Sequence, residues 1–255
     1  ASVACRAHTQ LLERTCDRTG YDSSLPLASI VRRAVTRSGD PQDHSLVHLA
    51  FGRLEGRVGR VAVAQRHFAL ARGLLTTDPN AYLSAAIDLD ESVVLWLTGD
   101  VASAIDLAER GAAIAFRIGW SRGRVAAGAN LACLYVCSGR LKEAQERIQQ
   151  ASRETFSSPS FKLAVADTKV RALLASGDYA AAEAILEANQ PELQSQPWYE
   201  LTFRQTQVEL LRRMNRWPEA MAKLSTCIQS ARQARLQTLL TGFQLTEAEI
   251  LIESE

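Results

Sequence analysis

The stretch ANLACLYVCSGRLKEAQERIQQA, residues 129–151, carries two helical patterns separated by Gly139. Before this glycine, small or apolar residues recur at i, i+3, i+4 and i+7, at positions Gly128, Leu131, Ala132 and Tyr135. After it, they recur in steps of four and three, at Ala144, Ile148 and Ala151. Both spacings place side chains on one face of a helix. Because glycine readily adopts the positive φ that ends a helix, the stretch predicts a helix, a tight turn and a second helix.

The same turn recurs along the chain at nearly constant spacing. The equivalent turn residues are Gly20, Gly59, Gly99, Gly139, Gly177 and Asn215. The steps between them are 39, 40, 40, 38 and 38 residues. A fixed period of about 20 to 50 residues is typical of solenoids, in which each unit shields its apolar face against the next.

Two further positions repeat with the turn. Five residues after it, five of the six units carry a small residue: Ala64, Ala104, Ala144, Ala182 and Ala220, whereas the first unit has Leu25. Four residues later come Phe68, Ala108, Ile148, Leu186 and Leu224. Small residues allow two helices to approach, and the larger ones fill the space between units. Alternating strand patterns are absent, and the proline-containing stretch at 187–198 is expected to be a loop.

The pattern resembles tetratricopeptide repeats, in which glycine ends the first helix and alanine lies early in the second. The resemblance implies an all-α fold, a right-handed α-solenoid of six to seven helix–turn–helix units. The expected units span residues 6–43, 44–83, 84–123, 124–161, 162–199 and 200–236, with a partial unit at 237–255, in one domain of residues 1–255. They exceed the family's ordinary length of about 34 residues.

Long units of this kind are similar to the repeat regions of bacterial regulators, of the LuxR-type, STAND and sigma-54 classes. The chain starts at Ala1 and stops within an amphipathic run, so it is expected to be part of a larger protein. It has no signal-peptide pattern and no apolar run of about 20 residues, which predicts a cytoplasmic protein without a membrane span.

Tetratricopeptide arrays bind partners on the concave surface formed by the first helix of each unit. Transferring the family's concave positions to this chain gives eleven candidate binding residues: Gln10, Arg14, Arg53, Leu89, Val93, Trp96, Asp167, Arg171, Gln205, Glu209 and Arg212. The groove is expected to be apolar in the middle and charged towards both ends, which suits a protein or peptide partner or a neighbouring domain of the same chain. A small-molecule effector is also compatible with it. The family's carboxylate clamp of Asn and Lys is not present at these positions.

No sequence motif indicates an enzyme, a cofactor or a metal. Phosphate-binding, dinucleotide-binding and nucleophile-elbow motifs are absent. His44 and His48 lie four residues apart without the glutamate of a zinc motif, and His8 and His67 are expected elsewhere in the array. The five cysteines show no paired framework and are expected to be small buried side chains.

The net charge of +1 gives no overall attraction to nucleic acid. Residues 1–76 hold eleven arginines and six acidic residues, but no reading helix or aromatic stacking platform accompanies them. The sequence therefore predicts a non-catalytic interaction or effector-sensing module of a regulatory protein. The alternative is a structural or oligomerisation scaffold that binds no effector.

Overall fold

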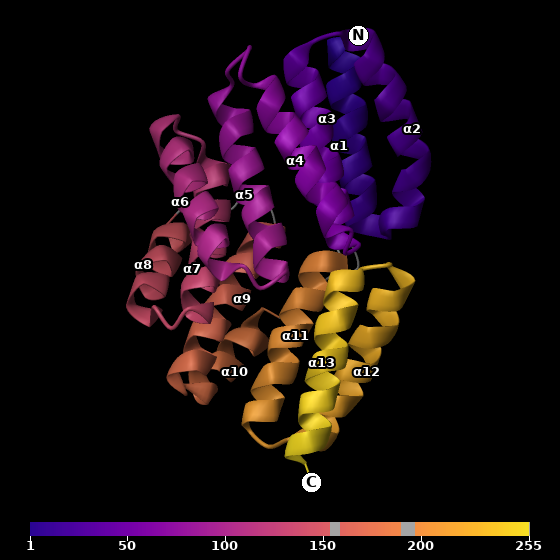
Figure 1. Ribbon diagram of the computed structural model, residues 1–255. Helices are drawn as coiled ribbons and strands as arrows, with labels where there is room; N and C mark the ends of the chain where they lie inside the picture. Colours follow the sequence, from indigo (N-terminus) through magenta and orange to yellow (C-terminus); the bar gives the residue numbers. More distant parts are fainter. Residues whose placement is uncertain (154–158, 190–196, 255) are drawn as a thin grey trace.

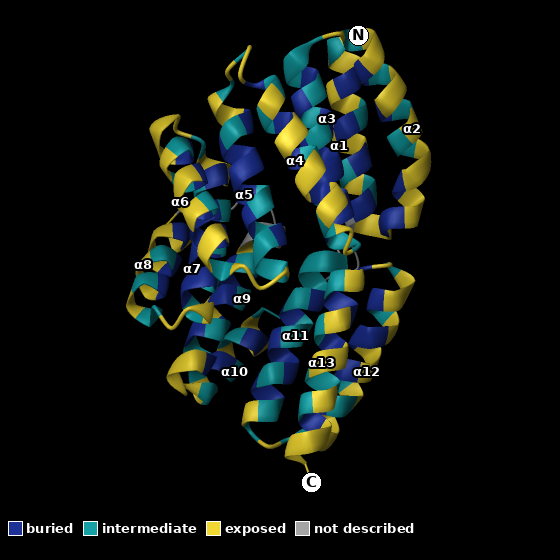
Figure 2. Ribbon diagram, in the orientation of Figure 1, coloured by how far each residue is buried: buried dark blue, intermediate teal, exposed yellow. Residues whose placement is uncertain are grey.

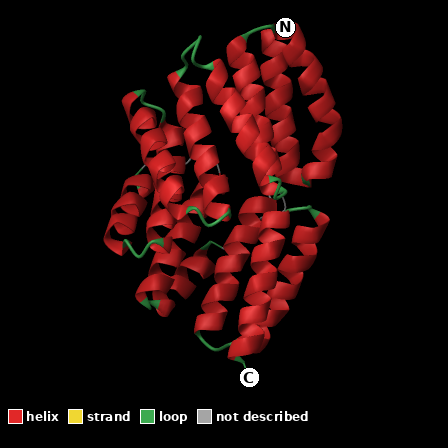
Figure 3. Ribbon diagram, viewed as in Figure 1, coloured by secondary structure: helices red, strands yellow, loops and turns green. Residues whose placement is uncertain are grey.

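The computed structural model describes residues 1–153, 159–189 and 197–254, and within these ranges it contains helices and no strands (Figure 3). The helices are α1 (Ser2–Thr19), α2 (Tyr21–Ser38), α3 (Pro41–Arg57), α4 (Val61–Leu74), α5 (Ala81–Leu97), α6 (Val101–Arg117), α7 (Ser121–Cys137), α8 (Leu141–Ser152), α9 (Pro159–Ser176), α10 (Tyr179–Ala188), α11 (Pro197–Arg213), α12 (Trp217–Gln233) and α13 (Gln237–Glu253). Of the expected loop at 187–198, residues 190–196 lie outside the described ranges.

Each odd-numbered helix up to α11 forms a hairpin with the helix that follows it. The six turns predicted from the repeat all have positive φ: 88° at Gly20, 80° at Gly59, 85° at Gly99, 75° at Gly139, 78° at Gly177 and 56° at Asn215. This left-handed backbone ends the first helix, and Asn is the usual replacement for glycine there. The hairpin prediction is confirmed at all six turns.

The hairpins stack in chain order into a two-layered solenoid (Figure 1). Each odd-numbered helix packs against the next odd-numbered helix and forms the inner layer. Each even-numbered helix packs against the odd-numbered helices before and after it and forms the outer layer. The fold-class prediction, an all-α solenoid, is confirmed.

The repeated alanines lie in the core between the layers. Ala64, Ala104, Ala144, Ala182 and Ala220 are all fully buried. Phe68 shows how tightly the helices approach: a Cβ added to Gly52 of α3 would lie 2.7 Å from its ring. Apolar clusters extend from one hairpin into the first helix of the next, as when Phe68 of α4 and Ile87 of α5 share a cluster. The stacking therefore removes from water the apolar faces that a single hairpin would expose.

Buried residues follow the contact between the layers, and exposed residues cover the outer helices (Figure 2). Among the described residues, no helix is long and apolar enough to cross a membrane.

The first and last hairpins also touch, which brings the two ends of the array together (Figure 1). The α12–α13 turn lies against the turns of the first two hairpins: the Thr238 hydroxyl donates to the Arg57 carbonyl oxygen at 2.9 Å, across 181 residues of sequence. A Cβ added to Gly20 would lie 3.0 Å from the carbonyl oxygen of Ala234. We call this contact between the ends the seam. It closes the inner layer into a full turn.

Candidate functional site

All eleven candidate residues lie on odd-numbered helices, but they differ in how much of each is accessible. Gln10 and Arg14 of α1 are exposed. Leu89 of α5 is only 4% exposed and packs against Gly111 of α6, so it offers little surface to a partner. The other eight are partly buried: Arg53, Val93, Trp96, Asp167, Arg171, Gln205, Glu209 and Arg212.

Arg53 joins the first three inner helices. Its guanidinium lies 2.6 Å from a carboxylate oxygen of Glu13 on α1 and also pairs with Asp90 on α5. The carboxylates on both sides hold the side chain across the inner layer, so Arg53 is already engaged within the array. The family's concave positions include neither Glu13 nor Asp90, because each lies at a different register from the candidate positions.

The middle of the inner layer carries an apolar patch, which we define as Val93 and Trp96 of α5 with Cys133, Val136 and Cys137 of α7. All are partly buried except Cys137, which is exposed. Hydrogen bonds from Cys133 and Trp96, together with the charge of Arg171, lower the pKa of Cys137. The inner patch thus combines an aromatic ring, two aliphatic side chains and two thiols.

All five cysteines were expected to be buried, and this prediction is wrong for two of them, Cys133 and Cys137. Cys5, Cys16 and Cys227 are buried, as expected. Cys133 is partly buried and Cys137 is exposed, because both lie on the side of α7 that faces away from its own hairpin partner. All five are free thiols.

Asp167 and Arg171 form an ion pair on α9, with Arg171 Nε 2.9 Å from Asp167 Oδ2. The hydroxyl of Thr206 on α11 donates to the other oxygen of Asp167 at 2.5 Å. Burial would lower the pKa of Arg171, but the adjacent Asp167 carboxylate raises it overall. Arg171 therefore stays charged and anchored to its neighbours. Gln205, next to Thr206, approaches Gly242 of α13.

At the C-terminal end, Arg212 of α11 bridges two helices. It pairs with Glu209 at 2.8 Å on its own helix and with Glu253 of α13 at 2.5 Å. Burial would raise the pKa of Glu209, but hydrogen bonds from Arg212 and Arg213 lower it overall. As with Arg53 and Arg171, the arginine is held by carboxylates. The inner layer thus has paired charges on both sides of the inner patch.

His67 was expected to lie away from His48, and this expectation is wrong: the two rings are direct neighbours. The Nδ1 atoms of His48 on α3 and His67 on α4 are 2.9 Å apart, which requires one ring to donate and the other to accept. Burial, with the neighbouring His67 and His44, lowers the pKa of His48 to about 4. Within the described ranges, no group of three or more His, Cys, Asp or Glu residues could hold a metal ion.

A buried ion network lies on the other side of the inner helices. Asp88 of α5, 5% exposed, accepts from Arg110 of α6 at 2.7 and 2.8 Å and from Arg72 of α4 at 2.7 Å. Burial lowers the pKa of each arginine, most strongly that of Arg72. The hydrogen bonds to Asp88, together with the charge of Glu91, outweigh this effect, so both pKa values are raised overall. Asp88 thus ties three consecutive helices together.

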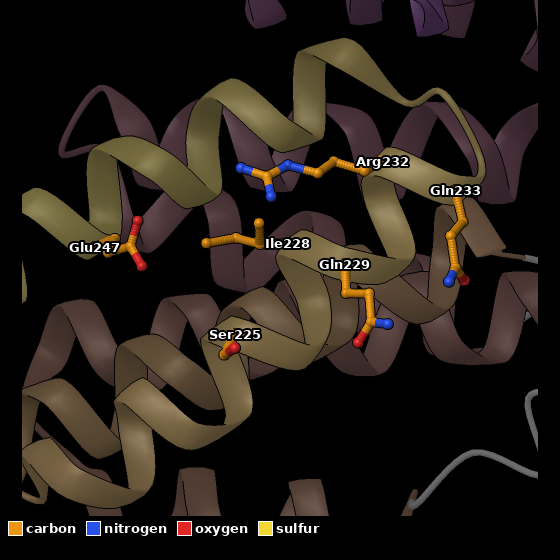
Figure 4. Close-up of a pocket in the computed structure, with 6 residues that line it drawn as sticks. All are labelled: Ser225, Ile228, Gln229, Arg232, Gln233 and Glu247. Carbon is orange, nitrogen blue, oxygen red and sulfur yellow. The ribbon is translucent and has the colours of Figure 1, made fainter.

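A surface groove of about 430 Å³ lies between α12 and α13, away from the candidate residues (Figure 4). Ile228 forms its floor, Ser225, Gln229 and Gln233 follow α12, and Arg232 reaches over the groove from one wall while Glu247 faces it from the other. It is polar and open, without the enclosure expected of a site for a small effector.

These features define a class: a solenoid of helical hairpins whose inner layer offers a partly exposed apolar patch between paired charges. Comparison of the sequence with protein-family models and with curated proteins finds no match. The fold does match solved structures. One is the crystal structure of a Rap protein complexed with competence and sporulation factor, with a TM-score of 0.67 and 13% sequence identity. The match covers 86% of this chain and 62% of that one, so this chain spans less than two thirds of the Rap protein.

Proposed function

We propose that this chain is an interaction module that binds a protein or peptide segment along its inner layer, with the inner patch as the main contact. The observation that carries the proposal is the partial exposure of Trp96, Val93 and Val136 on the inner layer. An aromatic residue that packs on the core on one side and stays partly exposed on the inner layer on the other is typical of a contact surface.

The paired charges narrow the type of partner. Arg53, Arg171 and Arg212 each have a carboxylate within ion-pair distance, so an anionic ligand would have to displace existing pairs. An extended or helical segment with an apolar centre fits without this cost, since it covers the inner patch and leaves the pairs in place. A small effector has weaker support, because the groove of Figure 4 lies outside the inner layer.

The fold comparison supports the same type of activity. A protein with this arrangement of hairpins has been solved with competence and sporulation factor bound to it. The resemblance to long-unit tetratricopeptide regions adds the proposed context: a regulatory or signalling protein of the bacterial cytoplasm, of the LuxR-type, STAND or sigma-54 classes, with the array as its sensing part.

The test uses a peptide selected against the wild-type chain from a random displayed library, with affinity measured by fluorescence anisotropy. Val93→Lys and Trp96→Ala should each weaken binding about tenfold or more, because one places a charge and the other a void at the contact. Leu70→Lys is the matched control, since Leu70 is 52% exposed on the outer helix α4 and should bind as the wild type does. Failure to select any peptide, or equal affinity in all variants, would contradict the proposal.

The second candidate is a structural or oligomerisation scaffold that binds no effector. The self-paired arginines favour it, because they leave the inner layer electrostatically satisfied without a ligand. If the inner patch is instead buried in a constitutive dimer, light scattering will give twice the chain mass at every concentration, and Val93→Lys will convert it to a monomer.

A further inference from the structure

Two of the five thiols lie next to each other on the inner layer. Cys133 and Cys137 are four residues apart on α7, which places both on one face of the helix. A hydrogen bond joins the two thiol groups, and the indole N–H of Trp96 on α5 also donates to the Cys137 sulfur. Cys137 is exposed and Cys133 partly buried, whereas the other three thiols are buried. The chain therefore presents one pair of adjoining sulfur atoms that a ligand can reach.

This pair is poorly placed to form a disulfide. Residues four apart on a helix have Cβ atoms about 5 to 6 Å apart. A disulfide requires Cβ atoms about 3.5 to 4.5 Å apart, so its formation would distort α7. An ion bound between the two sulfurs makes the link between them longer, so the helix can stay intact. The spacing therefore suits two ligands of one ion better than two halves of a disulfide.

The surroundings of the pair provide no further protein ligand. Within the described ranges, no third Cys, His, Asp or Glu side chain completes a metal site with these two thiols. Asp167 of α9, whose charge acts on Cys133, is already held by Arg171 at 2.9 Å and by the Thr206 hydroxyl at 2.5 Å. Structural zinc takes four protein ligands, and calcium and magnesium take oxygen ligands. The pair therefore does not suit any of these three ions.

Two thiols without a third ligand suit a soft cation that carries a single charge. Thiolate sulfur is a soft ligand and favours copper(I) among the common biological metals. Binding removes one proton from each thiol and forms one metal–sulfur bond to each sulfur, so the site gains a metal ion and loses two protons.

Arg171 makes the charge of the bound state acceptable. Two thiolates and one singly charged cation carry one negative charge together. The guanidinium of Arg171 on α9 lies close enough for its positive charge to act on both sulfurs. The other members of the inner patch, Val93, Trp96 and Val136, are apolar or aromatic and offer no competing oxygen ligand.

We propose that Cys133 and Cys137 together bind one soft, singly charged metal cation of the copper(I) type. The two sulfurs are the ligands, and the ion lies between α5 and α9 on the exposed side of α7. The site is part of the inner patch, but it depends on the two thiols and not on whether a peptide binds there.

Titration with copper(I) under anaerobic conditions, in competition with a coloured copper(I) chelator, tests this by giving the number of ions bound and their affinity. The wild-type chain should bind one ion, and X-ray absorption should show sulfur ligands alone. Cys133→Ser and Cys137→Ser should each weaken binding about a hundredfold or more, because a hard hydroxyl replaces one of the two soft ligands. Cys137 is exposed, so its replacement should leave folding unaffected, as circular dichroism of the metal-free chain will verify.

Two further variants separate this pair from the other thiols. The double variant Cys137→Ser with Ser138→Cys keeps five cysteines but moves one of them off the face shared with Cys133, so it should bind as weakly as Cys137→Ser. Cys227→Ala removes a buried thiol outside the pair and should bind as the wild type does. A wild type that binds no copper(I), a Cys137→Ser variant or double variant that binds as tightly as the wild type, or a nitrogen or oxygen ligand in the absorption spectrum would each overturn the proposal.

Discussion

Neighbouring hairpins and the two ends of the array are held together by different kinds of contact. Between neighbours, side chains such as Phe68 and Ile87 share apolar clusters from which water is excluded. At the seam, the contacts include a hydroxyl that donates to a carbonyl oxygen, the close approach of Gly20 to Ala234, an exposed ion pair from Arg235 to Asp22 at 2.8 Å, and the Arg57 guanidinium 5.4 Å from the centre of the Trp198 ring. The first kind recurs in every unit, and the second occurs once.

The difference shows which contact maintains the fold and which sets its shape. Apolar burial contributes about 25 cal/mol per Å², whereas an exposed ion pair contributes about 0 to 1 kcal/mol. Because each hairpin depends on its neighbours, a defect between two units should weaken the whole array. A defect at the seam should release the ends and leave the units folded. Four substitutions test this distinction.

The largest effect is expected for Phe68→Ala, in the contact between neighbours. The ring is fully buried against Gly52, so its removal should cost about 3 to 5 kcal/mol in the free energy of unfolding measured in urea. Leu70→Ala on the same helix, at a 52% exposed position, should cost less than about 0.5 kcal/mol. Equal losses in the two variants would show that the core between hairpins does not carry the stability.

Asp88→Ala should cost about 2 kcal/mol, because it leaves Arg72 and Arg110 without their shared carboxylate. The loss is smaller than for an ion pair buried on both sides, since the two arginines are 42% and 55% exposed and can be rehydrated. The same urea titration will measure it. Glu146→Ala, at an exposed position on α8, is the control, and a loss as small as in that variant would contradict the role assigned to Asp88.

Gly20→Ala should cost about 1 kcal/mol more than Gly139→Ala. Both positions have positive φ, so both alanines are strained, but only the one at residue 20 would also meet the Ala234 carbonyl oxygen, whereas residue 139 has nothing within 4 Å. Hydrogen exchange should become faster at the α12–α13 turn in Gly20→Ala alone. If exchange there is unchanged, the seam does not depend on this approach.

Thr238→Val should have the smallest effect, about 0.5 to 1 kcal/mol, because it removes one hydrogen bond while preserving side-chain volume. Thr241→Val is the matched control: the Thr241 hydroxyl donates to Gln237 on its own helix and does not reach across the seam. Small-angle scattering should show a larger radius of gyration for Thr238→Val only. Identical scattering from both variants would exclude the hydrogen bond as a contributor to closure.

The sequence predicted what is repeated and missed what occurs once. The six turns and the five buried alanines could be aligned because each turn has five counterparts and each alanine has four, and the repeat period was enough to place them. The contact between Thr238 and Arg57 has no counterpart in any other unit and joins residues 181 apart, so no local pattern indicates it. The proximity of His67 to His48 was missed for a related reason, since it depends on how one hairpin closes.

The sequence predicted which helices carry the candidate residues, but it did not predict which side chains these residues contact. All eleven residues lie on inner helices, because the family's positions follow the repeat. Their pairing does not follow it: Arg53 contacts Glu13 and Asp90, which sit at different places within their own units. The burial of Leu89 was not predicted either, because it depends on Gly111 of the neighbouring helix, which has no side chain and leaves room for Leu89 in the core.

The alanines between the layers also govern the circumference of the closed array. Ala64 and its four equivalents fix how far apart two adjacent helices lie, and these five spacings accumulate before the chain returns to Gly20. Enlarging one of them would shift the far end by a small step, whereas enlarging all of them would carry Ala234 out of reach. The size of the repeated alanine side chains, together with the close approach that Gly20 allows, thus sets the diameter of the closed array.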